Sequence, residues 1–346
     1  RTMRAMRIHR LAPIRPHSDP LVTDTLPVPE PRAGELLIEV IACGVCRTEL
    51  DEIEGRTAPP ELPMIPGHQV VGRVVHAGPG CRDGWIGQRV GVAWIHSACG
   101  HCSWCRRGLE NLCPEFCACG RDVHGGYAEY MTVGEDFAHP LPDAISDSHA
   151  APLLCAGAVG FRALRLCQLE DGDPLGLTGF GASAHLVLKM ARHLYPASEI
   201  CVFARNPTER AFALELGAGW AGDTTDSPPV NLSAIIDTTP AWTPVVAALG
   251  RLAPGGRLVI NAIRKETSDQ KVLEQLDYAK HLWQEKQLCS VANITRKDVR
   301  DCLELAAVAS LLPEVTQYPL EQANRALQEL KAGEIRGAKV LRVRSA

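Results

Sequence analysis

The chain has 346 residues, of which 46% are hydrophobic and 22% are charged, and this length accommodates two domains with separate cores. The net charge of −4 and the pI near 6.3 exclude the strongly basic surface that nucleic acids and anionic membranes attract. No apolar run reaches the roughly 18 residues of a membrane-spanning helix and no signal peptide opens the chain, so we expect a cytoplasmic location and no membrane partner.

Short apolar runs separated by glycine occupy the first part of the chain, to about residue 155. They include GELLIEVIACGV (34–45), HQVVGRVVHAG (68–78), GQRVGVAWI (87–95) and GGYAEYMTV (125–133). β-Branched runs bounded by glycine turns are typical of antiparallel strands. This part of the chain therefore predicts an antiparallel β domain.

From residue 173 the pattern changes to strands that alternate with helices. Residues 173–194 indicate a strand, a glycine turn and a helix, residues 199–218 repeat the strand and helix, and residues 231–263 continue the alternation. Such βαβ order predicts a parallel sheet covered by helices. The remaining segments, from about residue 292, indicate two helices and a last strand, at 296–309, 320–334 and 337–345.

Fourteen cysteines are the unusual feature of the composition. Four of them lie in CGHCSWCRRGLENLC, separated by two, two and seven residues: Cys99, Cys102, Cys105 and Cys113. Four thiolates at this spacing can surround one Zn²⁺ and leave no open position, which predicts a structural zinc site. An iron–sulfur cluster, or free or disulfide-bonded cysteines, are the alternatives. Cys117 and Cys119 break the pattern, and we expect them to be ordinary thiols.

Several motifs around this segment occur in a characteristic order: CGVCRTEL (43–50), PGHQVVGRVV (66–75), LLCAGAVGFRAL (153–164) and TGFGASA (178–184). Together with the cysteine segment they resemble the zinc-containing medium-chain alcohol dehydrogenases, nearly from end to end. The resemblance implies an α/β protein with an N-terminal catalytic domain of GroES-like β-barrel type and a Rossmann domain with a doubly wound parallel sheet. We expect the catalytic domain at 1–156 and 292–346, and the dinucleotide-binding domain at 157–291.

The resemblance also implies a catalytic zinc, with Cys46, His68 and Cys155 as its protein ligands, and hence two zinc ions per chain. Two thiolates and a neutral imidazole leave a tetrahedral zinc with one open position. An alcohol that enters there has its pKa lowered, so that an alkoxide forms near neutral pH. Without the resemblance, each of these residues would be interpreted as a buried thiol or an ordinary histidine. Cys43, close to Cys46, is expected to pack in the core.

Two residues beside this set bear on the metal. Glu49 occupies the position of a family carboxylate that accepts a hydrogen bond from the ligand histidine, which would fix the tautomer of His68; the alternative is a solvated loop acid. Gln69 departs from the family, which usually has glutamate after the ligand histidine. We expect the site to persist with altered ligand exchange, and Gln69→Glu tests this expectation.

A proton relay is implied at Thr48, whose hydroxyl can accept the substrate proton and pass one onward. In relatives the relay continues through the cofactor ribose to a histidine, but this chain has Asp51 there, and an unperturbed carboxyl has a far lower pKa. The end of the relay stays open between Asp51, water and another group. Trp94 stands where the family has an aromatic wall of the substrate pocket, and simple packing explains one tryptophan equally well.

The cofactor turn is predicted at Gly179, Gly181 and Ala184, which form GxGxxA between a strand and a helix. Arg47 is placed by the resemblance against the pyrophosphate. The second strand of this domain ends without the acidic residue that holds the ribose of NAD, and Arg205 follows it instead. We therefore favour NADP(H), with NAD(H) possible if Arg205 stacks on adenine or faces solvent.

The function implied is reversible hydride transfer between a primary or secondary alcohol and the nicotinamide cofactor. A polyol or other zinc dehydrogenase of the same superfamily is the alternative enzyme, and an inactive zinc-binding structural relative is the non-enzyme alternative. An intact ligand set with Thr48 argues against the latter. The expected partners are a small alcohol or aldehyde and further copies of the chain, as a homodimer or homotetramer, with no nucleic acid.

Overall fold

A computed structural model describes residues 1–334 and 336–344. The chain divides into two compact units: unit 1 comprises Arg1–Cys155 and Ile294–Ala346, and unit 2 comprises Ala156–Asn293. These divisions lie close to the domain boundaries at 156 and 292 expected from the sequence.

Unit 1 is built on a seven-stranded sheet. Its strands are β3 (Glu35–Val45), β4 (Val70–Ala77), β5 (Arg89–Val92), β8 (Tyr130–Gly134), β9 (Ala138–Pro140), β16 (Val315–Pro319) and β17 (Ala338–Arg342). The order is β16-β17-β3-β4-β5-β9, with β8 paired to β3 beside this path, and only β16 and β17 are parallel. Two small antiparallel pairs accompany it: β1 (Thr2–Ile8) with β2 (Leu21–Pro27), and β6 (Ile95–Ser97) with β7 (Cys117–Ala118).

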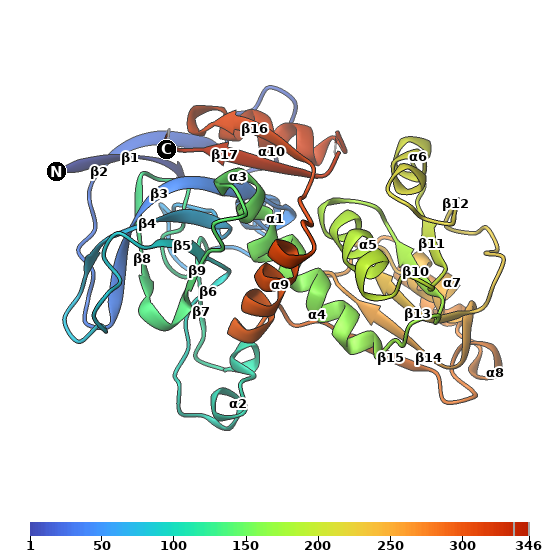
Figure 1. Cartoon of the computed structure of the whole chain (residues 1–346). Coiled ribbons are helices and arrows are strands. Elements are labelled where there is room, and N and C mark those ends of the chain that lie inside the picture. The colour runs from blue at the N-terminus through green and yellow to red at the C-terminus, as the bar shows by residue number, and fades with distance from the viewer. Residues whose placement is uncertain (335, 345–346) are drawn as a thin grey trace. The chain divides into compact units, whose positions relative to one another are not determined.

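The apolar runs of the sequence form these strands because their side chains fill one core. Ile38 and Val40 of β3, Val70 of β4 and Val90 of β5 are all fully buried. The closing segment of the chain returns to unit 1, where β17 lies between β16 and β3 (Figure 1). Position 345 of the predicted last strand lies outside the described residues.

Five α-helices and three 3-10 turns complete the regular structure described for unit 1. They are α1 (Arg47–Ile53), α2 (Ser103–Arg106), α3 (Asp147–Pro152), α9 (Arg296–Val308), α10 (Ala323–Lys331), η1 (Glu110–Leu112), η2 (Glu135–Phe137) and η5 (Leu320–Gln322). Helix α1 starts directly after β3, and Glu49 caps it by accepting a 2.6 Å hydrogen bond from the backbone N–H of Cys46. This cap fixes Cys46 at the junction between the sheet and the helix.

Unit 2 has a fully parallel six-stranded sheet with helices around it (Figure 1). Its strands are β10 (Leu175–Thr178), β11 (Ile200–Phe203), β12 (Trp220–Gly222), β13 (Leu232–Asp237), β14 (Leu252–Ile260) and β15 (Gln287–Ser290). Its helices are α4 (Ala158–Cys167), α5 (Ala182–Leu194), α6 (Pro207–Glu215), α7 (Thr243–Leu249) and α8 (Tyr278–His281), with a 3-10 turn η4 (Gln270–Gln275). The order β12-β11-β10-β13-β14-β15 is the doubly wound 3-2-1-4-5-6 arrangement of the Rossmann fold. The predicted fold class is confirmed.

A continuous helical run from Asp147 to Cys167 joins α3, a π-helical turn η3 (Leu153–Gly157) and α4. Among the described residues it is the one helix long and apolar enough to cross a membrane. Most of it is buried inside the protein, and the core helix of a soluble protein has the same length and composition. The run is therefore weak evidence for a membrane span.

Candidate functional site

The three predicted catalytic-zinc ligands come together in unit 1. Cys46 is the N-cap of α1, His68 lies two residues before the strand β4, and Cys155 lies in the π-helical turn η3, a kind of turn that is frequent at functional sites. Their ligand atoms all lie within 4.8 Å of one another, and Nε2 of His68 is 3.3 Å from Sγ of Cys155. Two thiols and an imidazole at this separation are a donor set that fits tetrahedral zinc with one position open.

Glu49 contacts the imidazole of His68 at Nδ1, the ring nitrogen that does not face Cys155. Its Oε1 lies 2.6 Å from Nδ1 of His68, and the side chains are 0% and 1% exposed. Glu49 is therefore a buried partner of His68 and not a solvated loop acid. Burial alone would lower the pKa of His68, but the charge of Glu49 raises it well above its ordinary value. Zinc binds an imidazole nitrogen that carries no proton, so metal binding at His68 competes with protonation of the ring.

The two thiols of the set differ in proton affinity. The hydrogen bond with Cys155 is the main reason that the pKa of Cys46 falls well below its ordinary value, and the nearby His68 adds to this. The same hydrogen bond and burial raise the pKa of Cys155. Cys43, which the sequence analysis assigned to packing, is fully buried in the core of unit 1.

The predicted relay residues lie on α1. The Oγ1 of Thr48 is 3.6 Å from Sγ of Cys46, so this hydroxyl adjoins the proposed metal position. Asp51 is buried, and its Oδ1 accepts a 2.5 Å hydrogen bond from Nε of Arg56. The carboxylate of Asp51 therefore has a fixed cationic partner.

Two further predicted residues are packed into unit 1. Gln69 is buried against β3, where a Cβ at Gly44 would lie 2.7 Å from its Cδ and Oε1, so the glycine provides the space for the amide. Trp94 is also buried. Its ring centroid is 5.0 Å from that of Phe116, and the guanidinium of Arg121 lies 5.6 Å from the ring. These contacts account for the position of Trp94 by packing.

The four predicted structural-zinc cysteines form a second cluster, with all four Sγ atoms within 4.8 Å of one another. Backbone N–H groups point at the sulfurs: Cys99 accepts from Cys102 at 3.3 Å, Cys102 from Cys105 at 3.4 Å, and Cys113 from Glu115 at 3.4 Å. Backbone hydrogen bonds of this kind lower the pKa of Cys99 to about 6. The cluster fits zinc held by four protein ligands. All fourteen cysteines lie among the described residues, and none of them, Cys117 and Cys119 included, is in a disulfide.

The predicted cofactor turn lies in unit 2, between β10 and α5. Gly179 has φ +78°, which favours glycine, and Gly181 is the N-cap of α5. A Cβ at Gly181 would have no protein atom within 4 Å, so the backbone there is open to a ligand, whereas Ala184 is fully buried. An open turn before a 13-residue helix fits a pyrophosphate group.

The end of β11 carries no acidic side chain. Arg205 is exposed there, and Nη1 of Arg210 donates hydrogen bonds to the carbonyl oxygens of Ala204 (2.7 Å) and Arg205 (3.0 Å). The segment is therefore held by its backbone while the guanidinium of Arg205 faces outward. Arg47, in unit 1, is exposed in the first turn of α1.

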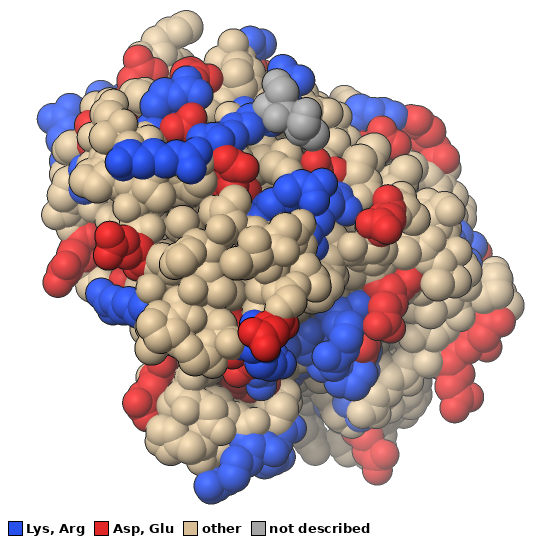
Figure 2. Space-filling model, turned by 60° about the vertical axis from the view of Figure 1, so that its left-hand side comes forward, with Lys and Arg blue, Asp and Glu red and all other residues tan. Residues whose placement is uncertain are grey.

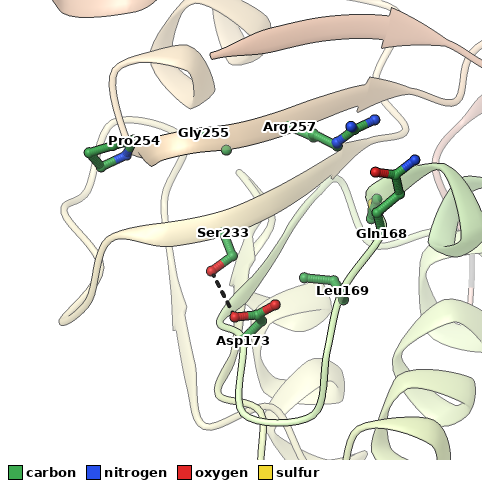
Figure 3. A pocket seen from close by; sticks show the side chains of 9 residues that line it. Gln168, Leu169, Asp173, Ser233, Pro254, Gly255 and Arg257 are labelled. Atoms are coloured by element: carbon green, nitrogen blue, oxygen red, sulfur yellow. Dashed lines mark hydrogen bonds between the residues drawn. The ribbon is translucent and has the colours of Figure 1, made fainter. Parts of the chain in front are cut away.

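A hollow of about 280 Å³ lies at the amino ends of the strands β10, β13 and β14 of unit 2 (Figure 3). Gln168, Asp173, Ser233 and Arg257 line it near the amino ends of the strands, and Oγ of Ser233 donates a 3.5 Å hydrogen bond to Asp173. Parallel sheets bind nucleotides at the carboxyl ends of their strands, so this hollow is separate from the cofactor turn.

Comparison with known proteins identifies the family. The alcohol dehydrogenase GroES-like domain matches residues 32–143. The "Probable alcohol dehydrogenase AdhA" of Mycobacterium tuberculosis (strain CDC 1551 / Oshkosh) is 45% identical over 345 residues, which cover 98% of this chain and 97% of that protein. The chain belongs to the zinc-containing medium-chain alcohol dehydrogenase family. The predicted family is thereby confirmed.

Other members of the alcohol dehydrogenase family match over nearly the whole chain. An alcohol dehydrogenase of Geobacillus stearothermophilus is 29% identical, with 96% of this chain and 99% of that protein covered. The solved structure of a thermostable alcohol dehydrogenase from Pyrobaculum aerophilum has a TM-score of 0.88 at 22% identity, with 99% and 100% of the two chains covered, and shares the fold. The protein is thus an oxidoreductase, as predicted.

Sequence reasoning missed three features of this alcohol dehydrogenase. Arg56 pairs with Asp51, and its only signal is a basic residue five positions after an acid. Glu52 is fully buried on α1, and neither carboxyl oxygen has a hydrogen-bond partner, so burial raises its pKa well above the ordinary value. A buried pair of Asp237 and Lys265 lies in unit 2, and its one signal is an acid at the end of a predicted strand.

Proposed function

We propose that this protein is a zinc-dependent alcohol dehydrogenase that transfers hydride reversibly between a primary or secondary alcohol and NADP(H). The observation that carries the proposal is the convergence of Cys46, His68 and Cys155 within 4.8 Å, with Glu49 against the imidazole. In the forward direction the alcohol carbon gives a hydride to NADP⁺ and the hydroxyl gives a proton. The products are a carbonyl compound, NADPH and H⁺.

The residues around the metal position have separate tasks. Zinc, when bound by the three ligands, supplies a Lewis acid that lowers the pKa of an alcohol. Glu49 keeps the proton of His68 on Nδ1, so that Nε2 is directed to the metal position. Thr48, 3.6 Å from the sulfur of Cys46, accepts the substrate proton and passes one onward. Asp51, bound to Arg56, acts as a fixed charge near this path.

Cofactor choice follows from the end of β11. Arg205 is exposed where enzymes specific for NAD have an acidic residue, and a guanidinium can bind the 2′-phosphate of NADP. Initial rates with both cofactors test this, together with an Arg205→Asp variant. We expect wild type to prefer NADP⁺ and the variant to lose most of that preference. A large preference of wild type for NAD⁺ would contradict the assignment.

A homodimer or homotetramer is proposed because of an exposed apolar edge in unit 2. Strand β15 ends the sheet order, so one side of it has no strand partner among the described residues. Large apolar side chains are exposed on it and before it: Leu276, Tyr278, Trp283 and Leu288. Such an edge is normally covered. Sedimentation velocity is expected to give a homo-oligomer, and a stable monomer at micromolar concentration would refute this.

The other proposed partners and the location follow from charge and thiols. Acidic and basic side chains are interspersed on the face shown in Figure 2, which suits a small-molecule substrate better than nucleic acid. Fourteen cysteines without a disulfide suit the reducing cytoplasm, where we place the protein.

Metal analysis combined with a substrate screen tests the central proposal. We expect two zinc ions per chain, one of which a chelator removes readily, and alcohol-dependent reduction of NADP⁺ that disappears with that ion and returns when zinc is added back. A panel of simple alcohols and polyols separates this enzyme from a polyol dehydrogenase. One tightly held zinc without cofactor binding would instead indicate an inactive structural relative.

A further inference from the structure

A buried carboxylate lies at the point where the strand order of unit 2 reverses. Strands β10 and β13 are neighbours there, and they end at Thr178 and Asp237. Asp237 is 0% exposed, and its Oδ1 accepts hydrogen bonds from the hydroxyls of Thr178 (2.7 Å) and Thr239 (2.8 Å). Doubly wound sheets bind their ligands just outside this point.

Lys265, which follows β14, completes the cluster. Its ammonium donates to Oδ2 of Asp237 and to the carbonyl oxygens of Thr239 (2.7 Å) and Ala241 (3.0 Å). Its side chain is 10% exposed. An ammonium has three donors, so the cluster uses all of them and none is left for a ligand. Lys265 therefore ties the segment after β14 to the segment after β13.

Residues 238–241, the segment after β13 that Lys265 holds, contact the cofactor turn. Thr238 donates to the carbonyl oxygen of Thr178 both from its backbone N–H and from Oγ1, each at 2.9 Å. A Cβ at Gly179 would lie 2.8 Å from Oγ1 of Thr238. The position of residues 238–241 consequently determines the surroundings of the glycine turn.

The charges of the cluster also matter for an anionic ligand. The ammonium of Lys265 and the carboxylate of Asp237 form a neutral pair beneath the turn. If the ammonium is removed, a buried carboxylate is left without its counter-ion, which both destabilises the segment and repels phosphate groups. If only the carboxylate is neutralised, a cation remains, which attracts phosphate while the geometry loosens.

We propose that Lys265 and Asp237 are positioning residues for the dinucleotide. The pair holds residues 238–241 against the glycine turn and keeps the buried charge beneath the phosphates balanced. This inference rests on the proposed binding of NADP(H) or NAD(H) at that turn.

The test measures NADPH and NADH affinity by fluorescence titration of the full-length enzyme, alongside thermal unfolding. The variants form a double-mutant cycle: Lys265→Met, Asp237→Asn and the two combined. We expect Lys265→Met to weaken binding by about tenfold, Asp237→Asn to weaken it less, and the double variant to bind more tightly than Lys265→Met. The KM for the cofactor is expected to rise in Lys265→Met while the KM for the alcohol stays near that of wild type.

A matched control separates positioning from general stability. Lys339, in unit 1, pairs with Glu329 at 2.9 Å and is similarly buried, so Lys339→Met is expected to lower the melting temperature without changing NADPH affinity. If Lys265→Met lowers the melting temperature as Lys339→Met does, but its affinity for NADPH stays within about twofold of that of wild type, the inference is overturned. If Lys265→Met does not fold, Thr178→Val carries the test, and unchanged affinity there overturns it. Absence of binding of both dinucleotides by wild type would refute the proposed function itself.

Discussion

Two buried carboxyl groups three residues apart on α1 allow a sharp test of the proposed catalytic metal site. Glu49 lies 2.6 Å from Nδ1 of His68, whereas Glu52 is equally buried and has no hydrogen-bond partner. We expect Glu49→Gln to weaken zinc binding at the catalytic site and Glu52→Gln to have little effect. Burial raises the pKa of Glu52 and so favours its neutral form, which an amide matches in shape, and its carboxyl contacts neither His68 nor the backbone N–H of Cys46.

The expected loss of zinc affinity can be worked out from the hydrogen bond between Glu49 and His68. A hydrogen bond to a charged group contributes about 1.5–3 kcal/mol, and a neutral one about 0.5–1.5 kcal/mol. Replacing the carboxylate of Glu49 by an amide therefore removes roughly 1.4 kcal/mol from the ligand His68, which corresponds to about tenfold in zinc affinity. Glu49→Ala removes the acceptor altogether and also the cap on the N–H of Cys46, so we expect about a hundredfold loss and a lower melting temperature.

The assay is competition with a chromogenic chelator, which separates a fast-exchanging and a slowly exchanging zinc. Only the fast class should respond to substitutions at Glu49, because the four-cysteine cluster is a separate set of ligands. If Glu49→Gln and Glu52→Gln change zinc release equally, or if neither changes it, the assigned role of Glu49 is wrong.

Three further predictions concern other parts of unit 1. Cys113→Ser is expected to leave one zinc per chain and lower the melting temperature; two ions by metal analysis would contradict a four-cysteine site. Thr48→Val should reduce turnover by at least about a hundredfold at unchanged zinc content, while Thr48→Ser retains most activity; a relay is excluded if valine is tolerated. Although burial opposes it, hydrogen bonds from Tyr318 and Lys339 lower the pKa of Glu329 to about 2. Because the folded-state pKa is depressed, this stabilisation is present above pH 4.5 and is lost as the pH falls toward 2. Glu329→Gln should therefore flatten acid unfolding over that window, and an unchanged acid transition by circular dichroism would count against the contact.

Local patterns of the sequence predicted the features that local physics determines. The four-cysteine cluster could be predicted because all four cysteines lie within 15 residues, from Cys99 to Cys113. The parallel sheet could be predicted because each strand and each helix has its own hydrophobic periodicity. The Cys46, His68 and Cys155 set joins a strand end, a loop and a π-helical turn, so only the family resemblance pointed to it.

Pairing between distant buried charges was beyond sequence reasoning. Nothing local distinguishes Asp237 as a partner of Lys265, because their pairing depends on which strands are neighbours in the sheet. A nearer pair escaped it too: the contact of Asp51 with Arg56, five residues later, depends on the turn after α1, so the sequence left Asp51 as a possible proton acceptor. In both cases the contact, not the residue type, decides what the carboxylate can do.

The interior place of β17 sets an order of events during synthesis. This strand pairs with β3, whose last residue precedes Cys46, yet β17 ends at Arg342. Ribosomes add about 5–20 residues per second, so the sheet behind Cys46 is completed roughly 15–60 s after that cysteine is made. The four-cysteine cluster and the contiguous unit 2 have no such delay. In a growing chain, therefore, the proposed structural metal can be bound before the last strand completes the sheet beside Cys46 of the proposed catalytic site.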